Sequence, residues 1–261
     1  MDEYGKVAEY YAKRVGAYDS QKTATWKSSG GFDSEVIPEI ARQLKGVSGP
    51  IIDFGVGTGR VASELIQRLG CTVVGVDVSD AMLAKAQENA DAGGYSGKLV
   101  LQRSSMDELA FASGVFWGGV STSAFHYVKD PLKTANEFRR VLRKGSVLAL
   151  GDLVSHENDT THFFDRLENA LSPVHQSYYS MSKRVSLFEP AGFERVTEKV
   201  ISYRKTFADL FRDKAAYFGG KEAENRFLRI LQEATPAERE LYRVEEDAME
   251  LLYGISVFSA V

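Results

Sequence analysis

Three glycines alternate with other residues in "DFGVGTGR", at Gly55, Gly57 and Gly59, directly after the apolar run "PIIDF". Such a loop between a strand and a helix lets the backbone approach a nucleotide-like ligand. A dinucleotide fingerprint needs Gly-x-Gly-x-x-Gly, but the sixth position here is Arg60, so the spacing does not fit NAD or FAD. No Gly-Lys-Ser/Thr follows, so the loop is not a P-loop. Asp53, just before the loop, would repel a diphosphate and suits a ligand that carries an ammonium and a sulfonium.

A second carboxylate follows at a matching distance. Asp77 ends the next apolar run, "TVVGVD", roughly 20 residues after the first loop glycine, where nucleotide-binding βαβ units place a ribose-binding carboxylate. An aspartate at a strand end is common in turns, but its pairing with the glycine loop indicates a ribose contact. Val78 and Met82 follow, and we expect both near an adenine edge.

The composition excludes several other classes of protein. The 261 residues are 44% hydrophobic and 26% charged, as in an ordinary globular protein. The chain has 32 Lys and Arg residues and 36 Asp and Glu residues. It therefore has no excess of basic residues to bind the phosphate backbone of a nucleic acid. Cys71 is the only cysteine, so an internal disulfide and a multi-cysteine metal site are excluded, and no His/Asp/Glu cluster has metal-ligand spacing. The sequence has no apolar signal region and no membrane-spanning run, so we expect a cytoplasmic protein.

The elements that must position these residues alternate in type. From Pro50 onward, strand patterns alternate with helix patterns as far as "SVLALGDL", which follows an expected turn at Lys144 and Gly145. This alternation predicts a parallel sheet covered by helices on both faces. Helix patterns precede it near residues 7–18 and 34–44. Beyond it, residues 156–190 and 202–252 are helical and aromatic, and "GFERVTEKVIS" and "GISVFSAV" read as two further strands.

These motifs together resemble the class I S-adenosylmethionine-dependent methyltransferases, small-molecule type (methyltransferase domain type 11). The resemblance is close over residues 55–152, in "DFGVGTGR", "VVGVDVSDAML", "LQRSSMDELAF", "GVSTSAFHYVKDP" and "ANEFRRVLRKGSVLALGDL". The later "ENALSPVHQSYYS", "FEPAGFERV" and "ILQEATPAEREL" resemble a bacterial subgroup related to quinone C-methyltransferases. The implied fold is α/β, Rossmann-like and doubly wound. Its mostly parallel seven-stranded sheet has an antiparallel last strand and a helical cap.

The resemblance divides the chain into three parts of a single domain. Residues 1–49 would close over the cofactor, residues 50–155 would bind S-adenosyl-L-methionine, and residues 156–261 would add strands and a substrate cap. The product would be S-adenosyl-L-homocysteine.

The cofactor contacts carry over residue by residue. Asp53 and Gly55 would face the methionine amino group, Gly57 would allow close approach, and Asp77 would hold the ribose. Ser105 stands where the family usually has an acidic residue for the adenine amine. The remaining expected contacts are Val78 and Met82 at the adenine, the Met106 backbone N–H, the Ser121 carbonyl, and Tyr11 and Tyr18 over the methionine end.

Methyl transfer requires little acid–base catalysis from a protein, because positioning the nucleophile in a cavity without water supplies most of the rate enhancement. An O–H or activated C–H acceptor also needs a base. His126 in "SAFHYV" follows the fourth strand and is either that base or a structural hydrogen-bonder. We expect His175, Tyr178 and Tyr179 on the substrate side.

The partner is expected to be a small, apolar or aromatic acceptor, bound by a monomer or homodimer. O-, N- and C-methylation are not distinguished by the sequence. A nucleic-acid methyltransferase would carry an Asn/Asp-Pro-Pro-aromatic element after the fourth strand, which "STSAFHYV" lacks. The alternatives are a protein or nucleic-acid methyltransferase and a non-catalytic module that binds the cofactor or a partner protein.

Overall fold

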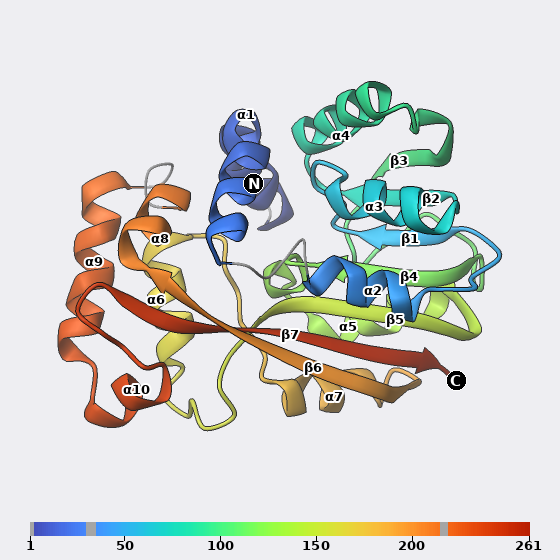
Figure 1. Ribbon diagram of the computed structural model, residues 1–261. Coiled ribbons are helices and arrows are strands. Elements are labelled where there is room, and N and C mark those ends of the chain that lie inside the picture. The colour runs from blue at the N-terminus through green and yellow to red at the C-terminus, as the bar shows by residue number, and fades with distance from the viewer. Residues whose placement is uncertain (1–2, 30–34, 215–218) are drawn as a thin grey trace.

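The computed structural model describes residues 3–29, 35–214 and 219–261, and its centre is one seven-stranded sheet (Figure 1). The strand order is β3-β2-β1-β4-β5-β7-β6. Strands β1 to β5 pair in parallel, and β7 runs antiparallel to both of its neighbours. The predicted doubly wound sheet is therefore confirmed. The strands are β1 Ile51–Phe54, β2 Val73–Asp77, β3 Leu99–Arg103, β4 Phe116–Thr122, β5 Leu142–Val154, β6 Phe193–Thr206 and β7 Ala248–Ala260.

Helices cover both faces of the sheet. Strand β1 is buried along its whole length, which is why its sequence is an unbroken apolar run. On one face it packs with α2, α3 and α4, and on the other with α5 and α7. The helices are α1 Glu3–Ser29, α2 Ile37–Gln43, α3 Arg60–Leu69, α4 Asp80–Gly93, α5 Pro131–Val141, α6 Phe163–Leu171, α7 Met181–Phe188, α8 Phe207–Asp213, α9 Gly220–Glu233 and α10 Pro236–Leu241.

Local sequence signals set where the helices near the site begin. The Ser79 hydroxyl accepts a hydrogen bond from the Met82 N–H and caps α4. Asp130 caps α5 in the same way, with Pro131 at its first position. Gly59 precedes α3 with a φ of 80°, and a β-carbon there would lie 3.3 Å from that of Ala86.

The cap lies beyond the carboxyl ends of the parallel strands. Figure 1 shows α6, α8 and α9 gathered on the side toward which β1 points, with α1 beside them. Buried side chains of α6, α8 and α9 form one apolar cluster with the start of β7. Ligands of open α/β sheets bind at this edge, so α1 and the cap enclose it.

Three details differ from the sequence-based expectation. Residues 202–206 and 248–252 belong to the antiparallel β6–β7 pair, which extends from Phe193–Ala260 to Thr206–Ala248 with one register shift between Arg195 and Thr197. Helix α7, expected in the cap, packs on the sheet, since Phe188 stacks on Phe258. Strand β5 begins at Leu142 and includes the expected turn, with Gly145 absorbing a φ of 81°.

Candidate functional site

A cavity with an empty volume of about 840 Å³ lies at the carboxyl ends of β1, β2 and β4, against α1. It brings together most of the residues predicted to contact a cofactor: Tyr11, Tyr18, Gly55, Gly57, Asp77, Val78, Met82 and Met106. These residues come from four separate segments of the chain. The fold therefore joins them as the two motifs imply.

Asp77 fastens the glycine loop to the start of α4. Its carboxylate accepts hydrogen bonds from the N–H groups of Gly57 (3.0 Å) and Ser79 (2.9 Å). Gly55 and Gly57 have φ of 77° and 54°, a region that favours glycine. A β-carbon on Gly55 would lie 2.5 Å from that of Ala124. The loop consequently leaves its backbone open to the cavity.

Asp53 lies buried beneath the loop, 1% exposed, and is not part of the cavity wall. Neither of its carboxylate oxygens has a hydrogen-bond partner among the described residues. Burial, with a smaller contribution from the charge of Asp77, raises the pKa of Asp53 to about 7. A buried carboxylate without a partner is costly, and a cationic ligand group nearby would offset that cost.

Two further predicted contacts lie off the cavity wall. Ser121 is fully buried, and its hydroxyl donates to the Phe54 carbonyl at 2.9 Å. Ser105 pairs with Glu108 in an isolated antiparallel β-bridge, and its side chain helps to lower the pKa of the neighbouring Asp107. Its neighbour Ser104 lines the cavity instead. Ser104 and Ser105 are adjacent, and the spacing of the sequence motif does not determine which of the two side chains lies on the cavity wall.

A second cavity, with an empty volume of about 800 Å³, lies between the sheet edge, α1 and the cap. It shares four wall residues with the first cavity: Tyr11, Tyr18, Ser123 and Tyr127. The Tyr11 hydroxyl donates to that of Tyr127 at 2.9 Å, which links α1 to the segment after β4. Ser123 has a φ of 52°, a strained backbone of the kind found at functional sites.

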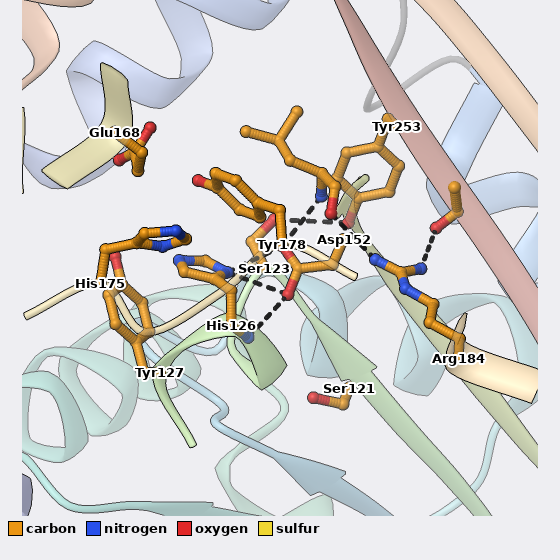
Figure 2. A network of polar contacts seen from close by, with 12 residues as sticks. Ser121, Ser123, His126, Tyr127, Asp152, Glu168, His175, Tyr178, Arg184 and Tyr253 are labelled. Atoms are coloured by element: carbon orange, nitrogen blue, oxygen red, sulfur yellow. Dashed lines mark hydrogen bonds and ion pairs between the residues drawn. The ribbon is translucent and has the colours of Figure 1, made fainter. Parts of the chain in front are cut away.

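His126 and Asp152 form a buried pair on the wall of the second cavity (Figure 2). The His126 Nδ1 lies 2.9 Å from both carboxylate oxygens of Asp152, and the His126 backbone N–H donates to Oδ2 at 3.2 Å. Because the carboxylate accepts at Nδ1, that nitrogen carries the proton and Nε2 is left with its lone pair. Sequence reasoning missed Asp152, although it ends the strand beside the one that precedes His126.

Burial lowers the pKa of His126 below its ordinary value of 6.5, although the charge and hydrogen bond of Asp152 act in the opposite direction. Burial acts to raise the pKa of Asp152, but His126 and then Arg184 hold it below its usual value. The pair is therefore a neutral imidazole beside a carboxylate at pH 7. This arrangement gives Nε2 the capacity to accept a proton.

The residues expected on the substrate side separate into two groups. Tyr178 lines the second cavity, with its ring centroid 4.9 Å from that of His126. His175 lies behind Tyr178, off the cavity wall, and its Nε2 is 2.7 Å from Asp165 Oδ1. Tyr179 also lies off the wall and packs against Phe125 next to the sheet.

Two negative findings apply to the described residues. Within ranges 3–29, 35–214 and 219–261, no three His, Cys, Asp or Glu side chains gather as metal ligands. Of the helices in the same ranges, none is both long and apolar enough to cross a membrane.

Comparison with known proteins agrees with this geometry. Residues 52–150 match the family model described as "Methyltransferase domain". The O-methyltransferase resE of Aspergillus sclerotiorum is 29% identical over 116 residues, 44% of this chain and 44% of that protein. The quinone-biosynthesis C-methyltransferase UbiE of a Geobacter species (strain M21) is 27% identical over 105 residues, 40% of this chain and 45% of that protein. This chain thus matches less than half the length of either relative.

Among solved structures, a putative methyltransferase from Bacillus halodurans C-125 superposes with a TM-score of 0.79 at 19% identity, over 88% of this chain and 99% of that one. This likeness establishes the Rossmann-like methyltransferase fold. The finer assignment to the quinone C-methyltransferase subgroup stays a prediction, because the relatives include O- and C-methyltransferases at similar identity. The chain carries, at residues 52–150, the methyltransferase domain of the class I S-adenosylmethionine-dependent methyltransferases.

Proposed function

We propose that this protein transfers a methyl group from S-adenosylmethionine to a hydroxyl group of a small apolar or aromatic molecule. One observation carries the choice of a hydroxyl. The second cavity adjoins the first and has on its wall a neutral imidazole whose Nε2 lone pair is free of Asp152. A hydroxyl must lose its proton as the methyl group arrives, and Nε2 can accept that proton.

The residues of the first cavity fit the cofactor. Asp77 on the cavity wall suits the ribose hydroxyls, and Asp53, buried beneath the wall, offers a carboxylate to a cationic group. Tyr11 and Tyr18 offer aromatic faces, which attract a sulfonium. S-adenosylmethionine, when bound, supplies a methyl group on a sulfonium that is already a good leaving group.

The chain's own residues would then act on the acceptor. His126 would take the hydroxyl proton at Nε2, and Asp152 would stabilise the imidazolium that forms while keeping the ring oriented. Helix α1 and the cap would exclude water and hold the acceptor beside the shared wall. The aromatic and apolar lining of the second cavity, which includes Tyr178 and Leu251, supports an aromatic acceptor.

The test is to incubate the purified protein with methyl-labelled S-adenosylmethionine and a panel of phenols, and to measure S-adenosylhomocysteine and labelled product. We expect product with a new O–CH3 group. Absence of S-adenosylhomocysteine with every acceptor would favour the non-catalytic alternative.

C-methylation is the second candidate, and one observation favours it. A C-methyltransferase is among the relatives, and the same Nε2 could accept a proton from an activated C–H. Carbon NMR of the labelled product separates the two, because O–CH3 and C–CH3 carbons resonate in different regions.

A further inference from the structure

The wall of the second cavity that comes from α1, β6 and α8 is positively charged. It includes Arg14, Lys205 and Lys214, and one carboxylate, Asp213. The Arg14 side chain is 8% exposed and that of Lys205 is 5% exposed, so both cations lie largely out of water. Burying cations is costly unless anions accompany them.

The carboxylates around this wall are already engaged. The Lys205 Nζ is 2.9 Å from Asp213 Oδ2, and Lys214 pairs with the buried Glu168. Arg14 donates to the Asp213 backbone carbonyl at 2.6 Å. Each lysine of this wall therefore has one carboxylate partner, Asp213 on the wall and Glu168 beside it, and Arg14 contacts a backbone carbonyl.

The two lysines also repel each other. Burial lowers the pKa of Lys205, Asp213 and then Asp209 oppose this change, and the charge of Lys214 makes the smallest contribution by lowering it further. A second carboxylate between the two ammonium groups would reduce both the repulsion and the cost of burial.

Between this wall and the His126–Asp152 pair, the cavity is lined by apolar and aromatic side chains. They are Leu153, Tyr178, Tyr203, Leu210 and Leu251. A ligand that fills the cavity thus meets a proton acceptor from the sheet edge, an apolar middle and cations from α1 and the cap.

We propose that the cationic wall formed by Arg14, Lys205 and Lys214 binds a carboxylate of the methyl acceptor, which is therefore a hydroxyaryl carboxylic acid. This inference rests on the proposed function and names the acceptor class of the same site. The cofactor's own carboxylate is a weaker candidate, because all three cations line the second cavity and none lines the first.

Calorimetry on the protein saturated with S-adenosylhomocysteine tests the proposal without requiring methyl transfer. The probes are 4-hydroxybenzoate, 4-hydroxyphenylacetate and 4-hydroxycinnamate, each compared with its methyl ester. We expect at least one acid to bind about 10- to 100-fold more tightly than its ester, the range for hydrogen bonds to a charged group.

Variants of the cationic wall test whether the preference for acids over esters arises from its lysines. Lys205→Met and Lys214→Met should each reduce the acid-to-ester ratio about tenfold or more, whereas Lys205→Arg should retain most of it. The matched control is Lys85→Met, whose exposed side chain pairs with Glu88 on α4. Circular dichroism and S-adenosylhomocysteine affinity show whether each variant is folded.

Equal affinity for every acid and its ester overturns the proposal, as does binding of none of the acids. A preference for acids that survives Lys214→Met and Lys205→Met, both folded, overturns the assignment to this wall. Failure of the proposed function would give a different result: no S-adenosylhomocysteine would form with any acceptor, although the acids would still bind.

Discussion

One ring nitrogen of His126 is available to accept a proton, because Asp152 binds Nδ1 and not Nε2, and His126 lines the second cavity. If Nε2 takes the acceptor proton, His126→Gln should lower kcat by roughly 10²- to 10⁴-fold while cofactor affinity stays unchanged. Steady-state kinetics and calorimetry with S-adenosylhomocysteine measure the two effects. The matched control is His162→Gln, an exposed histidine at the start of α6. Normal turnover in His126→Gln would make His126 a structural residue.

The same pair predicts a pH dependence. The base works when neutral, and burial places the pKa of His126 below 6.5. Thus kcat/KM should rise with pH through a midpoint below 6.5 and stay level above it. The charge of Asp152 raises the pKa of His126, so Asp152→Asn should move the midpoint to lower pH as well as reduce kcat. A midpoint above 6.5, or one unchanged in Asp152→Asn, contradicts this assignment.

Asp53 predicts a proton linked to cofactor binding. With a pKa raised to about 7, its carboxyl group is about half protonated at neutral pH. A cationic ligand group favours the ionised form, so binding should release a proton, and affinity should increase as pH rises through about 7. Calorimetry in two buffers of different ionisation enthalpy counts the protons. Asp53→Asn should reduce the count and Asp80→Asn, exposed at the start of α4, should not.

Asp77 is the residue on which cofactor affinity should depend most. Asp77→Ala removes the acceptor of two loop N–H groups and of the proposed ribose hydroxyls, a loss of roughly 2–4 kcal/mol in binding. Calorimetry with S-adenosylhomocysteine measures this loss, with Asp80→Ala as the control. An unchanged affinity would show that the ribose is held elsewhere.

At the scale of elements, α1 supplies Tyr11 and Tyr18 to both cavities and Arg14 to the second. Cofactor binding should therefore slow amide hydrogen exchange in the first turns of α1 and in the loop around Gly55. Helix α10, which contributes to neither cavity, is the internal reference. Mass spectrometry of exchanged peptides reports all three segments. Equal exchange in α1 with and without S-adenosylhomocysteine would mean that this helix does not respond to the cofactor.

The elements around the first cavity were predictable because their signals are local. The apolar run before Gly55, the Ser79 cap and Pro131 each fix a boundary by short-range chemistry. The position of α7 was not predictable, because its sequence continues the helical pattern of residues 156–190, and its place on the sheet depends on the stacking of Phe188 on Phe258. The His126–Asp152 pair also depends on tertiary structure, since His126 lies in the short helical turn after β4 and Asp152 lies in the adjacent strand β5.

At the scale of the molecule, Arg184 joins α7 to the centre of the sheet. Its buried guanidinium donates to the carbonyls of Gly254 in β7 (2.9 Å) and Leu153 in β5 (3.0 Å), close to Asp152 (Figure 2). Arg184→Leu leaves two buried carbonyls without that donor and removes a cation near a buried carboxylate. We expect the free energy of unfolding to fall by about 3–5 kcal/mol.

Urea denaturation followed by circular dichroism measures this loss. Arg68→Leu, on the exposed side of α3, is the control and should change stability by less than about 1 kcal/mol. A loss in Arg184→Leu no larger than in the control would mean that Arg184 does not stabilise the junction.

The wall shared by the two cavities also links their ligands. Both cavities are lined by Tyr11, Tyr18, Ser123 and Tyr127. A ligand that orders these side chains from one cavity therefore favours the binding of a ligand in the other cavity. Thermodynamic reciprocity requires each ligand to change the affinity of the other by the same factor. With S-adenosylhomocysteine in the first cavity, where we propose that the cofactor binds, acceptor binding would tighten in a complex that cannot react. Product inhibition should consequently deepen as the acceptor accumulates.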